Sequence, residues 1–234
     1  MRTHLLRELT RQAVPTLVAL TLATPALALS LDDLTQKDAS GGLKAALTQG
    51  IDKAVGQLSA TNGFLGNPKV TIPLPPALEK ANSALRLIGM GGQADELKET
   101  MNHAAEAAMG EATPVLKKAL KNMTLSDAKG ILSGGDDAGT RYFRGASGDE
   151  LRTKFKPIVA RATARLKLAS LYNQYAGKAA ELGLVSAADA DVNEYVTGKA
   201  LDGLFTIMAE EEQAIRKDPM GQASALIKKA FGAL

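Results

Sequence analysis

The residues with the clearest capacity for chemistry are acidic side chains grouped around one histidine. Glu99, His103 and Glu106 are four and three residues apart, so on a helix they share one face. Such pairs on a helix contribute only a few tenths of a kcal/mol and by themselves imply no catalysis. Other acids and hydroxyls that a hydrolytic site could use are Asp127, Asp136, Thr140 and Tyr142. One candidate function is therefore a carboxylate-based hydrolase around Glu99, Glu106, Asp127 and Asp136.

Several other classes of chemistry are excluded by what the sequence lacks. It has no cysteine, and hence no disulfide, thiol nucleophile, zinc finger or iron–sulfur cluster. Its two histidines form no cluster for a transition metal, so no metal site and no cofactor is expected. The glycine-rich segment 130–140 lacks the P-loop lysine, and Asp136-Asp137 lacks calcium-loop spacing. The G-x-S-x-G motif that places the nucleophile of many serine hydrolases does not occur in the sequence, so a Ser/His/Asp triad is not indicated. No catalytic residue is therefore assigned, and a non-enzymatic function is favoured.

Helices must position these side chains, and the apolar spacing predicts helices almost throughout the chain. Pro114 should kink or break the third helix. Thr124-x-x-Asp127, Ser147-x-x-Glu150 and Ser186-x-x-Asp189 are typical of helix starts, and Gly183 of a helix end. The expected helices span residues 43–58, 76–88, 93–123, 124 to about 133, 138–143, 147–182, 186–218 and 221–231.

A proline-rich segment interrupts this pattern. Asn62-Gly63 and Asn67-Pro68 are turn pairs, and the prolines of residues 70–76 force an extended backbone. We expect an apolar strap lying across the helices, with a short strand or two at most. The predicted fold class is all-α, a single domain of about seven or eight helices with a Pro-rich extended strap.

The first 28 residues are typical of a secretory signal. Arg2, Arg7 and Arg11 precede an apolar run at residues 13–22, and Ala26-Leu27-Ala28 has the pattern of a cleavage site. The run is too short for a membrane-spanning anchor and lacks the amphipathic character of a mitochondrial transit peptide. We therefore predict cleavage after Ala28, export to the periplasm of a Gram-negative envelope, and a single helical domain at residues 29–234. No later segment predicts a transmembrane span.

Charge is nearly balanced overall but unevenly distributed. The balance predicts no nucleic-acid partner, since such proteins carry a strong basic excess. Seven basic residues and no acid lie between Arg152 and Lys178, whereas residues 95–111 contain five acids and one lysine. These helices could pair with each other or present solvated faces. Alternatively, the basic one could flank an apolar face suited to anionic lipid head groups or an acidic partner.

A set of short motifs, taken together, resembles one protein family. They are Gly42-Leu43-Lys44-x-Ala46-Leu47, Asn62-Gly63-Phe64, Ile72-Pro73-Leu74-Pro75, Met101-Asn102-His103-Ala104-Ala105-Glu106, Asp127-Ala128-x-x-Ile131-Leu132, Tyr142-Phe143, Tyr195-Val196-Thr197, Ala200-Leu201-Asp202-Gly203-Leu204-Phe205 and Glu211-Glu212-x-x-Ile215-Arg216-x-Asp218-Pro219. From about Leu43 to Gly232 the chain resembles the exported bacterial family called domain of unknown function 4197. The resemblance implies an envelope location and a helical fold, and no established activity. His103 and Gln222 depart from it, since arginine is expected at both positions, which argues against an essential catalytic or ligand role for either.

Three functions follow for comparison with the structure. The leading one is a non-enzymatic periplasmic protein that binds an apolar or lipid-like ligand, or an envelope protein partner, and an apolar tunnel would support it. A cluster of buried carboxylates would support the hydrolase. A packed core with an exposed apolar patch would support a structural or assembly factor without a ligand. The residues proposed to line a ligand cleft are Asn102, His103, Glu106, Asp127, Thr140, Tyr142, Phe143, Arg161 and Arg165.

Overall fold

The computed structural model describes residues 36–183, 186 and 189–232. Within these residues the chain, whose apolar spacing predicts helices, folds into nine α-helices and a short 3₁₀ turn. The elements are α1 (Gln36–Ser59), α2 (Pro76–Leu87), α3 (Gly91–Ala108), the 3₁₀ turn η2 (Met109–Glu111), α4 (Ala112–Asn122), α5 (Leu125–Leu132), α6 (Ala138–Thr163), α7 (Lys167–Glu181), α8 (Val192–Lys217) and α9 (Ala225–Phe231). These residues contain no strand. The prediction of an all-α single domain is therefore confirmed. The predicted signal, residues 1–28 with its cleavage site, lies outside the described residues.

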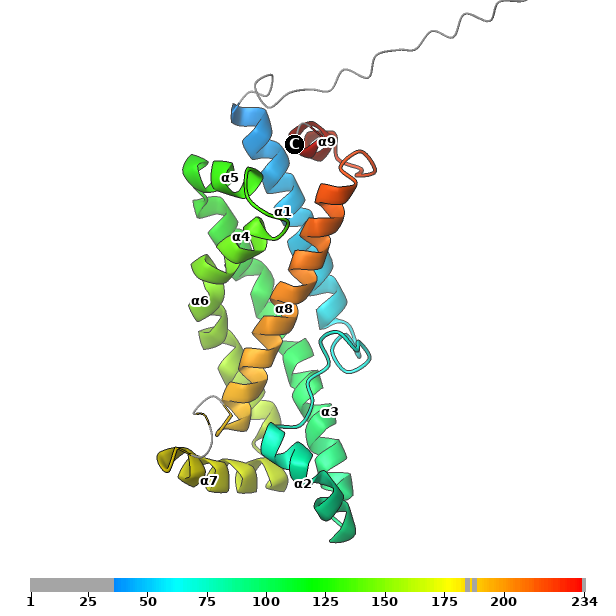
Figure 1. The fold of residues 1–234 in the computed structure, drawn as a ribbon, viewed down its shortest axis with the longest axis vertical. Coiled ribbons are helices and arrows are strands. Elements are labelled where there is room, and N and C mark those ends of the chain that lie inside the picture. The colour runs from blue at the N-terminus through cyan, green and yellow to red at the C-terminus, as the bar shows by residue number, and fades with distance from the viewer. Residues whose placement is uncertain (1–35, 184–185, 187–188, 233–234) are drawn as a thin grey trace, which may run out of the picture.

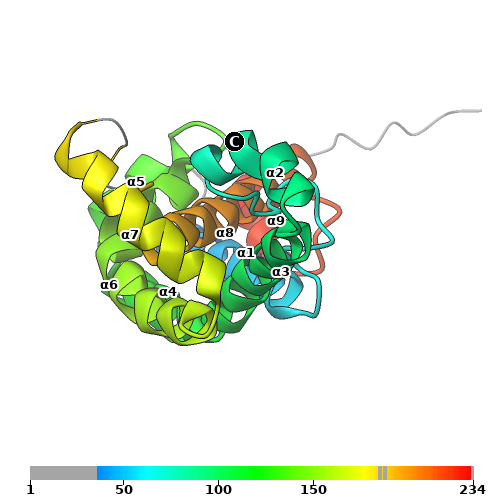
Figure 2. The ribbon, with the colours of Figure 1, turned by 90° about the horizontal axis from the view of Figure 1, so that it is seen from below.

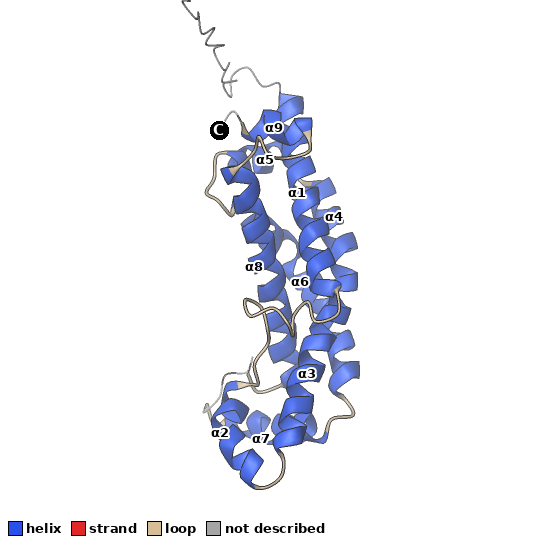
Figure 3. Ribbon diagram, turned by 90° about the vertical axis from the view of Figure 1, so that its right-hand side faces the viewer, coloured by secondary structure: helices blue, strands red, loops and turns tan. Residues whose placement is uncertain are grey.

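The helices form an elongated bundle (Figures 1 and 3). Helix α8 is its central element and packs against α1, α3 and α6. At one end α9 covers α1, while α4 and α5 lie against α6. At the other end α2 folds back on α3, and α7 lies across the end of the bundle (Figure 2). No helix in the described part is long and apolar enough to cross a membrane.

Local signals in the sequence begin and end several helices where predicted. Helix α3 ends at Ala108, and the 3₁₀ turn separates it from α4, which carries Pro114 in its first turn. The Thr124 hydroxyl accepts a hydrogen bond from the Asp127 amide (3.1 Å), and the Asp127 carboxylate accepts one from the Thr124 amide (2.9 Å). This reciprocal pair is the capping box of α5. Gly183 follows α7 with a φ of 72°, in the left-handed region.

Two predicted helix starts are wrong. Ser147 lies buried inside α6, where its hydroxyl donates to the Phe143 carbonyl, so residues 138–163 form one helix instead of two. The predicted helix 147–182 is instead interrupted at residues 164–166, where Leu166 is extended. Ser186 accepts a hydrogen bond from the Asp189 amide (3.2 Å), but α8 begins only at Val192 and is capped by Asp191. Both errors arise because serine hydroxyls bond nearby backbone groups inside helices and turns as well as at helix starts.

Residues 60–75 form turns followed by extended chain, which we call the 60–75 segment. Its side chains Phe64, Val70, Ile72 and Leu74 are buried in the core. The segment reaches α8 at Gly203, where a Cβ atom would lie 2.6 Å from the Phe64 ring and 3.3 Å from the Val70 Cβ atom. Only glycine therefore leaves room for Phe64 at this point of α8.

Replacement of this glycine tests the packing of the 60–75 segment. Gly203→Ala should lower the free energy of unfolding by about 1–3 kcal/mol, because the added methyl group overpacks the contact with Phe64. Urea unfolding followed by circular dichroism measures the change. Gly198→Ala on the same helix is the matched control, since a Cβ atom there meets nothing within 4 Å, and it should raise stability by up to about 1 kcal/mol. Equal effects of the two substitutions would contradict the packing described here.

Candidate functional site

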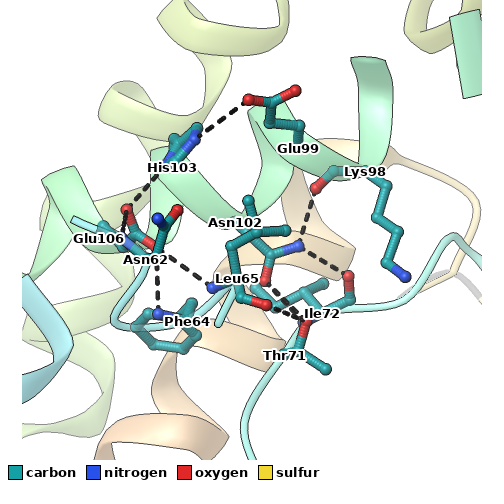
Figure 4. A network of polar contacts seen from close by, with 10 residues as sticks. All are labelled: Asn62, Phe64, Leu65, Thr71, Ile72, Lys98, Glu99, Asn102, His103 and Glu106. Carbon is teal, nitrogen blue, oxygen red and sulfur yellow. Dashed lines mark hydrogen bonds and ion pairs between the residues drawn. The ribbon is translucent and has the colours of Figure 1, made fainter. Parts of the chain in front are cut away.

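The residues predicted on one face of the third helix do lie together, and they hold the 60–75 segment (Figure 4). Asn102 lies completely buried on α3, and its side-chain amide forms hydrogen bonds with backbone groups. Its Oδ1 atom accepts from the Ile72 amide (2.8 Å), and its Nδ2 atom donates to the Ile72 carbonyl (2.9 Å) and the Lys98 carbonyl (2.8 Å). The arrangement satisfies both backbone polar groups of Ile72 in a chain segment that has no strand partner.

Glu106, four residues after Asn102 on α3, forms hydrogen bonds with the backbone of residues 62–65. Its buried carboxylate accepts hydrogen bonds from the amides of Asn62 (3.3 Å), Phe64 (3.1 Å) and Leu65 (3.2 Å). His103 Nδ1 lies 2.8 Å from the same carboxylate, and His103 Nε2 lies 3.6 Å from Glu99. Figure 4 shows the carboxylate surrounded by these groups. Glu106 is therefore occupied in holding the backbone.

These contacts shift the pKa values of both partners. The hydrogen bond to Glu106 raises the pKa of His103 above its ordinary value of 6.5, against a smaller opposing effect of burial. Burial raises the pKa of Glu106, but the His103 hydrogen bond and the Leu65 and Phe64 amides together outweigh it and lower the pKa below 4.5. A carboxylate held ionised by four donors is a poor proton donor and a weak base, so the cluster stabilises structure more readily than it could catalyse hydrolysis.

The predicted residues Asp127, Tyr142 and Phe143 also have structural partners. Asp127 caps α5, and its hydrogen bonds with Thr124 lower its pKa. The Tyr142 hydroxyl donates to the Ala119 carbonyl (3.0 Å), and burial followed by the nearby Asp127 charge raises its pKa. Phe143 is completely buried, with its ring edge-on to that of Tyr142. Asp136 lies exposed in the turn before α6. No hydrogen bond or ion pair among the described residues joins these acids to Glu106.

Thr140 belongs to a buried charged cluster that the sequence did not reveal. The Glu212 carboxylate on α8 accepts from the amides of Gly139 (2.9 Å) and Thr140 (2.8 Å) and from the Thr140 hydroxyl (3.0 Å). Arg216 donates to Glu212 (2.9 Å) and to the Ile131 carbonyl (2.8 Å), and its guanidinium lies 5.4 Å from the Phe231 ring. The pair thus caps α6 and joins α5, α6, α8 and α9.

This cluster escapes sequence reasoning for a physical reason. Spacing alone identifies Glu212 and Arg216 as a helical ion pair, which is typical of a solvated surface. In the structure their side chains are only 7% and 9% exposed. Gly139 allows the approach, since a Cβ atom there would lie 2.6 Å from the Leu47 side chain and 3.2 Å from both carboxylate oxygens. No local sequence pattern indicates that Gly139 contacts Glu212, which follows it by more than seventy positions.

The basic residues of the acid-free stretch divide into two groups. Arg152 and Lys156 pair with Glu194, and Lys154 lies 3.5 Å from Glu111. The other four, which we call the α7 cations, are Arg161 in the last turn of α6, Arg165 in the loop that follows, and Lys167 and Lys178 on α7. They are exposed, and none forms an ion pair within the described part of the chain. The predicted site residues Arg161 and Arg165 therefore lie apart from Glu106, Asp127 and Thr140.

In the described part of the chain, the predicted site residues do not line a common pocket either. An enclosed hollow between α1, α8 and Phe231 has a volume of about 10 Å³, which is room for about one water molecule. An open groove of about 440 Å³ runs between α6 and α8. Its cations are already engaged, since Arg141 pairs with Asp137, and Arg144 pairs with Asp202 and lies over the Phe205 ring. Residues 39–183, 186 and 189–232 contain no cluster of three metal-binding side chains.

The pKa shifts of His103 and Glu106 predict how stability depends on pH. The folded His103 pKa is raised, so the stabilisation from its charge is complete below pH 6.5 and is lost as pH rises through the raised value. The Glu106 pKa is lowered, so its contribution is present above 4.5 and is lost as pH falls through the lowered value. His103→Arg stays charged over the whole range. As pH rises from about 5.5 to about 9, its free energy of unfolding should therefore increase relative to that of the wild type. Unfolding curves at both pH values measure this; a difference that does not change with pH would contradict it. Relative to the uncharged control His103→Gln, the wild type should lose stability over the same range.

The Glu212 cluster predicts a large loss of stability. Glu212→Gln leaves Arg216 buried without its counter-charge and should lower the free energy of unfolding by about 3 kcal/mol. Glu210→Gln is the matched control, because Glu210 forms an exposed pair with Lys69 worth less than about 1 kcal/mol. Chemical denaturation of both variants decides the matter, and a small effect at Glu212 would show that the cluster is not structural.

Comparison with known proteins supplies a family but no relative of known activity. No curated protein and no solved structure matches the chain. The family model described as "Protein of unknown function (DUF4197)" matches residues 33–232, which include α1 to α9 and both buried clusters. The match covers well over half of the chain and agrees with the resemblance carried by the sequence motifs. The protein belongs to the DUF4197 family.

Proposed function

We propose that the protein is a non-enzymatic docking protein of the bacterial cell envelope, which contacts its partner with one end of the helical bundle. The end is the one formed by α7 and by the turn between α2 and α3. We call it the α2–α7 end, defined by Leu87, Ile88, Tyr175 and Leu182. The export signal and the family resemblance support the location, and the surface of the bundle supports the contact.

The observation that carries the proposal is the exposure of large apolar side chains at this end. Leu87 is 88% exposed, Ile88 69%, Tyr175 67% and Leu182 76%. Helices α2 and α7 both lie at the same end of the elongated bundle (Figures 1 and 3). The remaining large apolar side chains with high exposure in the described part are Leu125, Met220 and Leu226. Leu87 with Ile88 and Tyr175 with Leu182 are two exposed apolar sites at this end, and exposed apolar surface is typical of a contact with a partner or a membrane.

The other two functions have less support from the geometry. A ligand enclosed between the helices would need a cavity of several hundred Å³, whereas the hollow between α1, α8 and Phe231 has a volume of about 10 Å³. A hydrolase would need carboxylates that face a common cleft, whereas Glu106 is bonded to the 60–75 segment and Asp127 caps a helix. A packed core with an exposed apolar end favours a structural or assembly role, for which docking is the physical requirement.

Position-specific photo-crosslinking in cells tests the proposal. A photoreactive amino acid at Leu87 or Leu182 should give discrete adducts, with protein or with lipid, because these side chains would lie in the contact. The same amino acid at Leu125 or Met220 is the control, since both positions are exposed and lie on other elements. Adducts should form at least several times more strongly from the first pair. Equal labelling from all four positions, or none from Leu87 and Leu182, would overturn the proposal.

A further inference from the structure

We propose that α7 binds the surface of an anionic lipid bilayer, lying flat on the head groups across the end of the bundle. The inference rests on the proposed function, since it names the occupant of the α2–α7 end. It is carried by the charge of this end, by the orientation of α7 and by the residue types on its outer face.

The α7 cations form no ion pair with acidic side chains of the described part of the chain. The sequence has no acid between Glu150 and Glu181. Glu194 and Glu111 engage the three basic residues nearest the middle of α6. The α7 cations, which follow, have no ion-pair partner in the described part of the chain. Their counter-charge must therefore come from solvent ions or from an anionic surface. An anionic leaflet attracts each such basic residue through its surface potential.

The orientation of α7 directs one of its faces away from the bundle. Leu168, Ala169, Tyr172 and Ala176 are buried and define its inner face. The Tyr172 hydroxyl donates to the Asp189 carbonyl, which fixes the helix to the chain before α8. The helix lies across the end of the bundle, as Figure 2 shows from below. In Figure 1 the turn between α2 and α3 projects further than α7 at this end, so a flat surface that touches α7 also meets this turn.

The outer face of α7 has the residue types of a membrane interface. Tyr175, Lys178 and Leu182 are three and four residues apart and share one stripe, and all three are exposed. Tyrosine has an apolar ring and a polar tip, and it is enriched at the level of the lipid head groups. Lysine can extend its charge to the phosphates while its stem stays apolar. Glu181 is the one acid of α7 and lies at its last residue, three positions after Lys178.

The exposed turn after α2 adds an apolar contact at the same end. Leu87 and Ile88 stand next to each other on the turn, which Gly89 closes with a φ of 77°. Two adjacent aliphatic side chains with almost no cover can enter the boundary between head groups and acyl chains. Beside them Arg86 pairs with Asp95 at 2.6 Å, and the exposed acids Glu79 and Glu96 lie on α2 and α3 behind the turn. A bilayer is favoured over an acidic protein because the cations are long, exposed side chains spread from the last turn of α6 to Lys178 on α7, without fixed partners or a surrounding pocket.

Vesicle binding by the full chain tests the inference. The protein should co-sediment with vesicles of 70% phosphatidylcholine and 30% phosphatidylglycerol and should not do so with pure phosphatidylcholine. Lys167→Gln/Lys178→Gln should lower the partition coefficient by about 25-fold, which is about fivefold for each basic residue removed. Raising the salt concentration to about 0.5 M should release the wild type, since such attraction is screened within a Debye length.

The matched control has the same change in net charge. Lys121→Gln/Lys129→Gln removes two exposed lysines on α4 and α5, at the other end of the bundle, and should change binding by less than about twofold. Circular dichroism should show unchanged folding for both variants, because all four lysines are exposed. An equal loss in the control would mean attraction by net charge alone and would overturn the inference.

The result also separates this inference from the proposed function. Photo-crosslinks from Leu87 and Leu182 to lipid, together with binding to anionic vesicles, support both. If the vesicles do not bind while these positions still cross-link to a protein, the occupant is a protein, so the inference fails and the docking function stands. If neither vesicles nor cross-links respond to the α2–α7 end, both fail.

Discussion

The fold depends on how a chain segment without a helix is buried. Residues 60–75 place four apolar side chains in the core, and their backbone must find hydrogen-bond partners that no strand provides. Asn102 and Glu106 supply those partners from one face of α3, because residues four apart on a helix point the same way. Without these partners, burial of Phe64 and Ile72 would leave backbone amides unsatisfied, at a cost of about 1–3 kcal/mol each.

Glu212, the other buried carboxylate, also accepts hydrogen bonds from backbone amides. Glu212 accepts the amides at the start of α6, where the positive end of the helix dipole favours a negative charge. Arg216 neutralises that charge and also satisfies the last turn of α5. The two glutamates most deeply buried in the protein are thus both bonded to backbone amides. Of the acidic residues that suggested catalysis, Glu106 and Asp127 are ones that hold the backbone.

Because the interior is occupied in this way, function must be sought on the surface. The acid-free stretch supplies both parts of the answer. Its first three basic residues join α6 to α8 and to the 3₁₀ turn through Glu194 and Glu111. Its remaining four lie in the last turn of α6, in the loop after it and on α7, the helix that also carries the exposed Tyr175. A single run of charge in the sequence therefore has a structural half and a half that is available to a partner.

The sequence by itself determined what short-range physics controls. Apolar spacing predicted an all-α domain, Pro114 the separation of α3 from α4, and Thr124 with Asp127 the start of α5, because each effect acts within a few residues. It also predicted that Glu99, His103 and Glu106 share one face. Only the tertiary structure decided what that face does, since the partners of Glu106 and Glu212 lie some forty and seventy residues away. It likewise decided that α6 continues through Ser147 and that the chain turns at Leu166, because packing outweighs the weak local preference of a serine.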